Sequence, residues 1–308
     1  MKKIFFLFGL LYSLSSKGQL PETVIYLFDV QKSVKGLTLS HPKIISKKKG
    51  YNNQPYFTMD GDYLFYVSAI DTVNIELYKV AMQKKKYKSK RITHTKEAEY
   101  SPKYTPDMEH ISCVRVEQDR KTQHFYSYNL KGKKPINILP KLSSIGYYEW
   151  LNQNEVLSFE LPEPFYLVKH HISLGRADTL ATDIGRTFYH LRAKGKVVYV
   201  DKSDSNKWVI RTIASENLKT FNKKMNVPNP LLTETLPHEE DYCFTQDGSI
   251  LMGHEGILYI KKNPFRNANA TWDEVIDLKT FGIEKFYRIA MSVDNTKLAV
   301  VAYTGKKP

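Results

Sequence analysis

The densest group of side chains that could do chemistry is the run His238–Asp241, HEED, in which one imidazole precedes three carboxylates. Such a group could hold a cation, a basic peptide or a sugar, or it could be a solvated loop. Hard cations require several convergent oxygen ligands, and three adjacent carboxylates cannot all converge. We therefore expect no metal site, and we keep the run as a candidate ligand contact.

The other histidines give no better catalytic or metal signal. His170 and His171 are adjacent in an expected strand, where successive side chains face opposite ways, so they cannot chelate one ion from the same face. His254-Glu255 and His238-Glu239 lack the second histidine of a zinc-protease helix. The chain also has no G-x-S-x-G elbow, no G-x-G-x-x-G after a strand and no phosphate-cradling loop. The sequence therefore predicts no catalytic residue, no cofactor and no metal ligand.

The elements that would position a site are set by one recurring stretch, Tyr51–Ser68. Two β-rich runs flank an Asp60-Gly61 turn, which is the pattern of a hairpin. Taking Asp60 as a marker, the equivalent turn positions follow at steps of 47, 46, 41, 53 and 47 residues. They are Asp107, Gln153, Lys194, Asp247 and Asp294. A period in the forties built from strands alone predicts propeller blades.

Large side chains recur on one face of the first strand of each unit, three and five residues before the marker. An inner strand that packs against the next blade requires this period of two. Further strands are expected at Ile75–Val80, His124–Leu130, Phe165–Ile172, Lys207–Ile213 and Gly256–Lys262, with shorter polar fourth strands at Lys90–Thr93, Pro135–Leu139 and Asp273–Leu278.

The sixth unit has only two strands before the C-terminus, and its missing pair is expected at the N-terminus. Thr23–Val30 matches the third-strand pattern and Lys43–Lys47 matches the fourth. We therefore predict an all-β, six-bladed propeller that is closed by N-terminal strands completing the last blade.

The motifs resemble the TolB-type six-bladed propeller, whose repeat reads approximately N-x-x-P-x-F/W-S-P-D-G-K-x-I-A-F. The match is best at Asn52–Val67, Tyr100–Val114, Tyr242–Leu251 and Ile25–Val30. Blades three and four depart from it, because Gln153 and Lys194 replace the turn aspartate. The resemblance implies the fold and an exported bacterial protein, whereas the fold carries scaffolds, receptors and some enzymes.

Residues 1–18 have the pattern of a secretory signal peptide: two lysines, an apolar core and small residues before a cleavage point at Gln19. We expect residues 19–308 to form one propeller domain with no transmembrane segment, exported to the periplasm or beyond. The two cysteines, Cys113 and Cys243, belong to blades two and five, so we expect free buried thiols.

The net charge is +14, and it falls to about +11 when the three lysines of the leader are removed. A solvated rim that protects sheet edges explains much of this charge. The functional alternative is attraction to an anionic partner in the envelope, such as an acidic protein face or an anionic glycan. No nucleic-acid-binding module is visible, so nucleic acid is not an expected partner.

The expected recognition surface is the mouth of the central channel, where loops lead into the inner strands on a rigid scaffold. The candidate ligand-binding residues are Asn53, Gln54, Glu99, Tyr147, His238, Glu239, Glu240, Asp241 and Arg288.

Three functions remain open. The first is a non-catalytic, monomeric scaffold that binds an envelope protein or a glycan. The second is a polysaccharide lyase or hydrolase that uses channel-mouth groups, for which Glu99, Glu240 and His238 are the candidates. The third is a sensor component that binds a cation or a small molecule.

Overall fold

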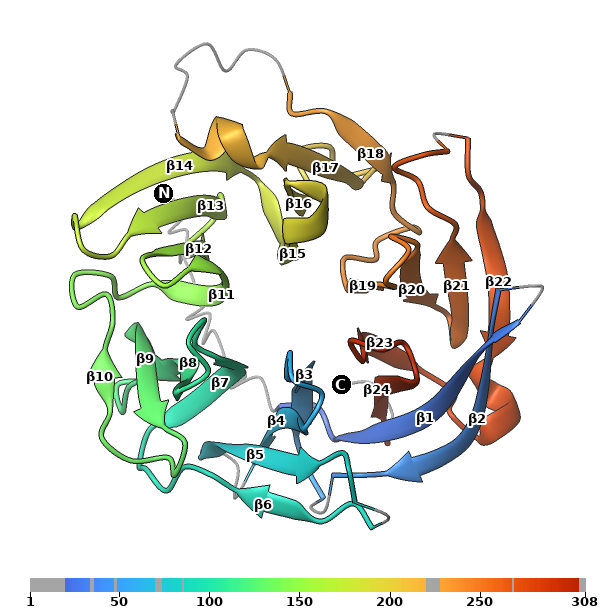
Figure 1. The fold of residues 1–308 in the computed structure, drawn as a ribbon, viewed down its shortest axis with the longest axis horizontal. Helices are drawn as coiled ribbons and strands as arrows, with labels where there is room; N and C mark the ends of the chain where they lie inside the picture. Colours follow the sequence, from blue (N-terminus) through green and yellow to red (C-terminus); the bar gives the residue numbers. More distant parts are fainter. Residues whose placement is uncertain are drawn as a thin grey trace, which may run out of the picture.

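The computed structural model describes residues 20–33, 36–46, 49–69, 74–84, 86–219, 228–267 and 269–304. Within these residues the strands form six four-stranded antiparallel sheets, and the helices are three short 3-10 turns. The sheets stand like blades around a central axis (Figure 1). The expected six-bladed, all-β propeller is confirmed. The predicted signal peptide, residues 1–18, lies outside the described residues.

Each blade runs outwards from the axis in chain order. In blades one to three the strands are β3 (Asn52–Phe57), β4 (Tyr63–Ala69), β5 (Ile75–Ala81), β6 (Ser89–Arg91); β7 (Ala98–Tyr104), β8 (His110–Val116), β9 (Gln123–Asn129), β10 (Ile136–Asn137); and β11 (Ile145–Asn152), β12 (Glu155–Glu160), β13 (Tyr166–His171), β14 (Arg176–Thr182). In blades four and five they are β15 (Ile184–Leu191), β16 (Lys196–Asp201), β17 (Val209–Ala214), β18 (Leu231–Glu234); and β19 (Tyr242–Phe244), β20 (Ile250–His254), β21 (Ile257–Lys261), β22 (Trp272–Asp277).

Blade six combines the two ends of the chain, as the sequence predicted. Its inner strands are β23 (Phe286–Met291) and β24 (Lys297–Tyr303), and its outer strands are β1 (Thr23–Ser33) and β2 (Gly36–Ile44). Strand β1 pairs antiparallel with β24 from Thr23↔Tyr303 to Asp29↔Lys297. Strand β2 begins at Gly36, earlier than the expected Lys43–Lys47. The chain turns back directly after β1, and β2 pairs with most of the length of β1.

A repeated hydrogen-bond pattern explains why the chain turns after the inner strand. In blade one the Thr58 hydroxyl donates to the Asp60 carboxylate over 2.5 Å, and that carboxylate accepts the backbone N–H of Asp62 over 3.0 Å. A Thr or Ser and an Asp two residues later do the same in blades two, five and six. Side-chain capping of this kind is the reason that Asp and Ser/Thr favour turns.

The hydrophobic core is divided into six clusters, each lying between two neighbouring blades. The cluster between blades six and one contains Ile25, Leu27 and Val301 together with Phe57 and Leu64. Because each cluster is shared by two sheets, no blade buries its apolar surface alone. The inner strands are therefore held in fixed positions around the axis.

Both cysteines are buried and free, as expected. Cys113 lies in β8 and Cys243 in β19, in blades two and five. In the described residues no helix is long and apolar enough to cross a membrane.

Candidate functional site

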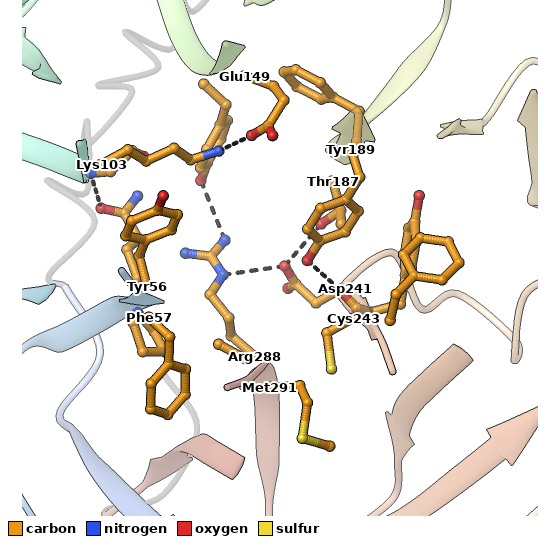
Figure 2. A pocket seen from close by; sticks show the side chains of 18 of the residues that line it. Tyr56, Phe57, Lys103, Glu149, Thr187, Tyr189, Asp241, Cys243, Arg288 and Met291 are labelled. Atoms are coloured by element: carbon orange, nitrogen blue, oxygen red, sulfur yellow. Dashed lines mark hydrogen bonds and ion pairs between the residues drawn. The ribbon is translucent and has the colours of Figure 1, made fainter. Parts of the chain in front are cut away.

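The candidate site is the central channel, which the six inner strands surround. Residues from all six blades line a cavity of about 350 Å³ (Figure 2). Residues four and six positions before the turn marker line the cavity in every blade, although Phe188 and Cys243 also belong to the buried clusters between blades. The four-residue position is held by Tyr56, Lys103, Glu149, His190, Cys243 and Ala290, and the six-residue position by Gln54, Ser101, Tyr147, Phe188, Asp241 and Arg288.

The polar centre of the channel consists of Asn53, Tyr147, Arg186, Asp241 and Arg288, which we call the arginine layer. Arg288 Nε lies 3.2 Å from Asp241 Oδ1, and Arg288 Nη1 donates to Asn53 Oδ1 over 3.2 Å. The other Asp241 oxygen accepts a hydrogen bond from Arg186. Figure 2 shows Arg288 pointing across the channel towards Asp241. Two guanidinium groups from blades four and six therefore share one carboxylate from blade five.

The ionisation of Asp241 is controlled by these arginines. Burial raises the pKa of the Asp241 carboxyl, but the charges of Arg288 and Arg186 outweigh burial and bring this pKa to about 2. The Thr187 hydroxyl donates a further hydrogen bond over 3.2 Å. Asp241 is therefore a permanent anion at neutral pH, and it cannot act there as a general acid.

Aromatic rings surround the Arg288 side chain, which is only 13% exposed. Its guanidinium carbon lies 5.6 Å from the ring centroid of Tyr147 and 5.9 Å from that of Tyr287. Asn53 Nδ2 donates to the hydroxyl oxygens of Tyr287 and Tyr51, over 2.5 and 2.7 Å. The layer is thus held on several sides, so it presents a pre-organised cationic surface.

Glu240 lies at the edge of the arginine layer. Its Oε2 accepts the backbone N–H of Arg186 over 2.9 Å, and Lys202 Nζ lies 3.6 Å from the same oxygen. Gly185 makes this approach possible, because a Cβ at that position would lie 2.7 Å from Glu240 Oε2. The charge of Glu240 is therefore matched within the protein.

The structure brings together Asn53, Tyr147, Asp241 and Arg288 among the residues proposed from sequence. Gln54 lies beside them in the channel wall, where its Oε1 accepts the backbone N–H of Ser101 over 2.7 Å. Glu240 contacts the layer through Arg186, as described above.

The other three proposed residues lie elsewhere. His238 packs edge-on against Trp208, and Glu239 pairs with His254 over 3.2 Å. Glu99 is fully buried between blades one and two, where it accepts hydrogen bonds from Thr95, Thr93 and Tyr128; its exposed fraction is 0%. The carboxylates and the histidine that were considered for sugar cleavage therefore do not converge.

Further channel residues were not among the proposed site residues. Lys103 and Glu149 form an ion pair in the channel wall, and Lys103 Nζ also donates to the Tyr148 carbonyl over 2.9 Å. His190 lies in the same part of the wall, and its buried Nδ1 has no hydrogen-bond partner among the described residues. Burial lowers the pKa of His190. The alternation of the inner strand could have identified these residues, because they stand between the large blade-facing side chains.

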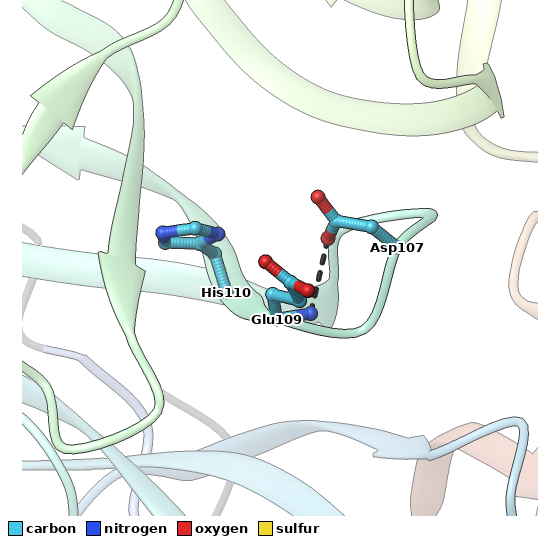
Figure 3. Close-up of side chains that lie close together, drawn as sticks. All are labelled: Asp107, Glu109 and His110. Carbon is cyan, nitrogen blue, oxygen red and sulfur yellow. Dashed lines mark hydrogen bonds between the residues drawn. The ribbon is translucent and has the colours of Figure 1, made fainter.

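Asp107, Glu109 and His110 form the one group of three potential metal-ligating side chains found in the described part of the chain (Figure 3). Asp107 Oδ1 already accepts the Thr105 hydroxyl and the Glu109 backbone N–H, over 2.5 and 3.0 Å. The same hydrogen bonds occur at the equivalent turns of other blades. The hydrogen bonds of the turn therefore account for the closeness of these three side chains.

Comparison with solved structures supports the fold assignment. A protein described as TolB from Agrobacterium tumefaciens is similar with a TM-score of 0.64 and 10% identity, covering 92% of this chain and 99% of the other. TolB from Acinetobacter baumannii is similar with a TM-score of 0.55 and 11% identity, covering 92% and 64%. Oligogalacturonate lyase in complex with manganese is similar with a TM-score of 0.55 and 13% identity, covering 86% and 80%.

No protein-family model matches the sequence, and no curated protein sequence matches it either. At these identities the likeness concerns the fold alone. The chain is thus a six-bladed β-propeller whose structural relatives include TolB proteins.

Proposed function

We propose that this chain is an exported, non-catalytic binding module of the cell envelope, which recognises a carboxylate-bearing protein segment or an anionic glycan at the arginine layer. Export is supported by the leader pattern of residues 1–18, and the scaffold role by the likeness to TolB propellers. The single observation that carries the proposal is the sharing of one carboxylate by two arginines.

The arginine layer and its two charged neighbours, Glu240 and Lys202, contain one more cation than anion. Asp241 is bonded to both Arg186 and Arg288, while Glu240 is approached by both Arg186 and Lys202. These five groups carry a net charge of about +1. Arg186 is the accessible member, since its side chain is 33% exposed. Its Nε and Nη2 already donate to Asp241 and its Nη1 lies 3.4 Å from Glu240, so a ligand carboxylate would accept from the remaining N–H groups of Arg186.

A groove next to the layer gives the ligand further surface. It has a volume of about 660 Å³ and shares Gln54 and Tyr147 with the channel wall. Tyr51, Tyr100 and Phe159 add aromatic surface to it. Aromatic rings provide large apolar contact, and the tyrosine hydroxyls provide polar contact. A flat, partly polar ligand such as a glycan or an extended peptide suits this combination.

Binding of size-matched oligomers to the exported chain tests the proposal. Isothermal titration calorimetry would compare a uronic-acid oligosaccharide and a poly-glutamate peptide with neutral dextran. We expect one of the anionic probes to bind and dextran to fail. Arg186→Gln should weaken that binding about tenfold or more, as expected for the loss of a charge-assisted hydrogen bond. Arg176→Gln is the matched control, since Arg176 pairs with Asp178 on outer strand β14.

Two outcomes would contradict the proposal. The first is binding of dextran as tight as that of the anionic probes, and the second is unchanged binding by the Arg186→Gln variant. Chain shortening of the oligosaccharide during the titration would instead support the polysaccharide-cleaving alternative.

A further inference from the structure

The outer rim of the propeller has two parts that differ in charge. The outermost strands of blades three, four and five contain carboxylates, namely Asp178 in β14, Glu234 in β18 and three acidic residues in β22. The outermost strands of blades six, one and two, which are β2, β6 and β10, contain none. Every blade has an edge to protect, so edge protection alone does not explain this difference. Blades six, one and two are neighbours around the ring (Figure 1).

Eight lysines gather on the part of the rim whose outermost strands have no carboxylate. All but Lys43 belong to the segments 77–96 and 120–148, which contain no Asp or Glu. No described carboxylate lies within 4 Å of any of the eight ammonium groups. We call these residues the lysine rim: Lys43, Lys79, Lys86, Lys88, Lys90, Lys131, Lys133 and Lys134.

Blades six and one meet within the lysine rim. Lys43 Nζ, from β2, lies 5.6 Å from the ring centroid of Tyr87, which stands between two of the lysines just before β6. Lys79 and Lys90 lie opposite each other in β5 and β6. Burial lowers the pKa of Lys79, and the charge of Lys90 lowers it further. Like charges directly opposite each other are unfavourable in a sheet, so a bound anion would relieve their repulsion.

The three lysines of blade two lie on the turn between β9 and β10. Asn129 Oδ1 accepts the backbone N–H groups of Lys131 and Lys133 over 3.1 and 3.0 Å, so the turn is held in place. A Cβ at Gly132 would lie 2.0 Å from the carbonyl oxygen of Ile92, directly after β6. The turn therefore rests against blade one, and its lysines continue the basic surface of that blade.

Large apolar side chains are exposed among these lysines. Leu130 and Ile136 stand on either side of the lysines of the β9–β10 turn, with 42 and 55% of their surface exposed. Ile44, which follows Lys43, is 57% exposed. None of the eight lysines lines the channel or the groove beside the arginine layer. The lysine rim is therefore a separate, amphipathic surface on the outside of the molecule.

Carboxylates near the lysine rim do not cancel its charge. In the adjoining strands, Glu76 is buried and paired with Arg91, and Asp29 is paired with Lys297. The β3–β4 and β7–β8 turns carry four exposed acidic residues. Even with all four counted, eight lysines against four carboxylates leave a net charge of +4. The four are Asp60, Asp62, Asp107 and Glu109.

We propose that the lysine rim binds the anionic headgroups of a lipid bilayer, with Leu130 and Ile136 inserted at the level of the headgroups. Lysine is a compact point charge on a flexible stem, so a row of lysines suits a mobile array of lipid phosphates better than a ligand of fixed shape. The affinity of an amphipathic surface for a membrane grows with buried apolar area and with attraction to anionic lipids. A soluble polyanion would contact the lysines but would gain nothing from the two apolar side chains.

Co-sedimentation with vesicles tests the proposal, using the chain from residue 19 onward, which contains every described strand. The chain should bind vesicles of phosphatidylglycerol and phosphatidylcholine in equal parts, but not vesicles of phosphatidylcholine alone. Added salt should release it, because salt screens exposed charges. The variant Lys131→Gln, Lys133→Gln, Lys134→Gln should bind at least tenfold more weakly, since each lysine near an anionic surface contributes about fivefold to the affinity.

A control variant and an apolar variant separate the lysine rim from general charge. The control Lys207→Gln, Lys262→Gln, Lys279→Gln removes three exposed lysines from blades four and five and should leave vesicle binding nearly unchanged.

The variant Leu130→Ser, Ile136→Ser keeps the charge and should weaken vesicle binding by about threefold or more, because less apolar area is buried. Equal binding to neutral vesicles, or an equal loss in the control variant, would overturn the inference. Unchanged vesicle binding by the apolar variant would also overturn it, in favour of a soluble polyanion.

Discussion

Asp241 shows how one buried residue organises the arginine layer. Its carboxylate is 6% exposed and contacts two guanidinium groups. A buried ion pair gives little net stability compared with apolar packing, but removing one partner leaves a charge without compensation. The position is therefore far more sensitive to substitution than its place directly before the short inner strand β19 suggests.

Asp241→Asn should lower the free energy of unfolding by about 3 kcal/mol, because Arg186 and Arg288 would lose their shared counter-charge. The pKa of Asp241 in the folded protein is about 2, below the ordinary 3.8, so its stabilisation is complete above pH 3.8 and is lost as pH falls through 2. Urea denaturation at pH 7 and at pH 3 measures both effects. Asp178→Asn, on outer strand β14, is the control, and an equal loss in both variants would contradict the explanation.

Glu99, which was proposed as a ligand contact, differs from Asp241 because the effect of burial on its pKa outweighs the effects of its partners. Burial raises the pKa of its carboxyl to about 7, against the hydrogen bonds from Thr95, Tyr128 and Thr93, which lower it. Glu76 also lies close by, and its charge adds to the increase. The folded protein therefore holds a proton on Glu99 at a pH where the unfolded chain has lost it.

Glu99→Gln should remove a pH dependence of stability. In the native protein the free energy of unfolding should fall as pH rises from about 4.5 to 7, because the folded state binds the extra proton in that window. The total loss is on the order of 3 kcal/mol above pH 7. Thermal unfolding across pH 4 to 8 gives the slope. The exposed turn variant Glu109→Gln should keep the native slope, and a Glu99→Gln variant that also kept it would exclude this assignment.

The site could be predicted only in part at the residue scale. The alternation of the inner strands identifies which side chains face the channel, and it would have included Lys103, Glu149 and His190. It could not show that Glu99 turns into the blade, because irregular pairing after Tyr100 changes the register within β7. Nor could it show that Arg186 and Arg288, from different blades, meet at the same carboxylate.

At the scale of elements, local chemistry explains which blades were easy to predict. The Thr/Ser-x-Asp turn occurs in blades one, two, five and six, where the carboxylate accepts the neighbouring hydroxyl and a backbone N–H. Blade three uses Asn152, whose Oδ1 accepts the Asn154 N–H over 2.9 Å. Blade four uses a 3-10 turn that ends at Gly195 in the left-handed region. Because blades three and four reverse the chain with other turn types, the Thr/Ser-x-Asp pattern is missing from their sequence.

Close packing between blades adds a constraint that no repeat pattern reveals. Gly253 lies in β20, and a Cβ at this position would lie 2.3 Å from the Phe286 ring of β23. Phe286 belongs to the cluster shared by blades five and six. The absence of a side chain at position 253 therefore allows the two sheets to approach.

Gly253→Ala should lower the free energy of unfolding by about 1–3 kcal/mol, because the added methyl group overpacks the interface between the two blades. Urea denaturation measures the loss. Phe286→Leu in the same chain should recover part of it by vacating the space, so the double variant should be more stable than the sum of the single losses predicts. Strict additivity would show that the contact with Phe286 is not the cause.

At the scale of the molecule, the order of the blades and their closure followed from the period of the sequence. The period of the sequence did not predict that β1 would be buried on both faces. On one face of β1, Phe28 belongs to the cluster between blades five and six, and the partly buried Val24 and Tyr26 pack against that cluster. Ile25 and Leu27 face the other way, into the cluster between blades six and one.

This double burial makes β1 the closing element of the ring. Ile25, Leu27, Phe28 and Val30 are each at most 6% exposed. At about 1.5–3 kcal/mol for each large apolar side chain, their loss amounts to about 6–12 kcal/mol. That range is similar to the whole stability of a typical domain, about 5–15 kcal/mol. A chain that lacks residues 20–46 should therefore show no cooperative thermal transition by circular dichroism.

A circular permutant separates the loss of these contacts from the loss of chain order. Strands β24 and β1 are antiparallel neighbours, with Thr23 opposite Tyr303, and the Thr304 N–H donates to the Glu22 carbonyl over 3.1 Å. A short glycine-containing turn can therefore join Thr304 to Glu22 in a chain that begins at residue 49 and ends at residue 46. This permutant retains every contact of β1 and should melt cooperatively, whereas the deletion should not. A cooperative deletion, or a permutant that fails to fold beside a stable parent chain, would show that closure by β1 does not hold the six blades together.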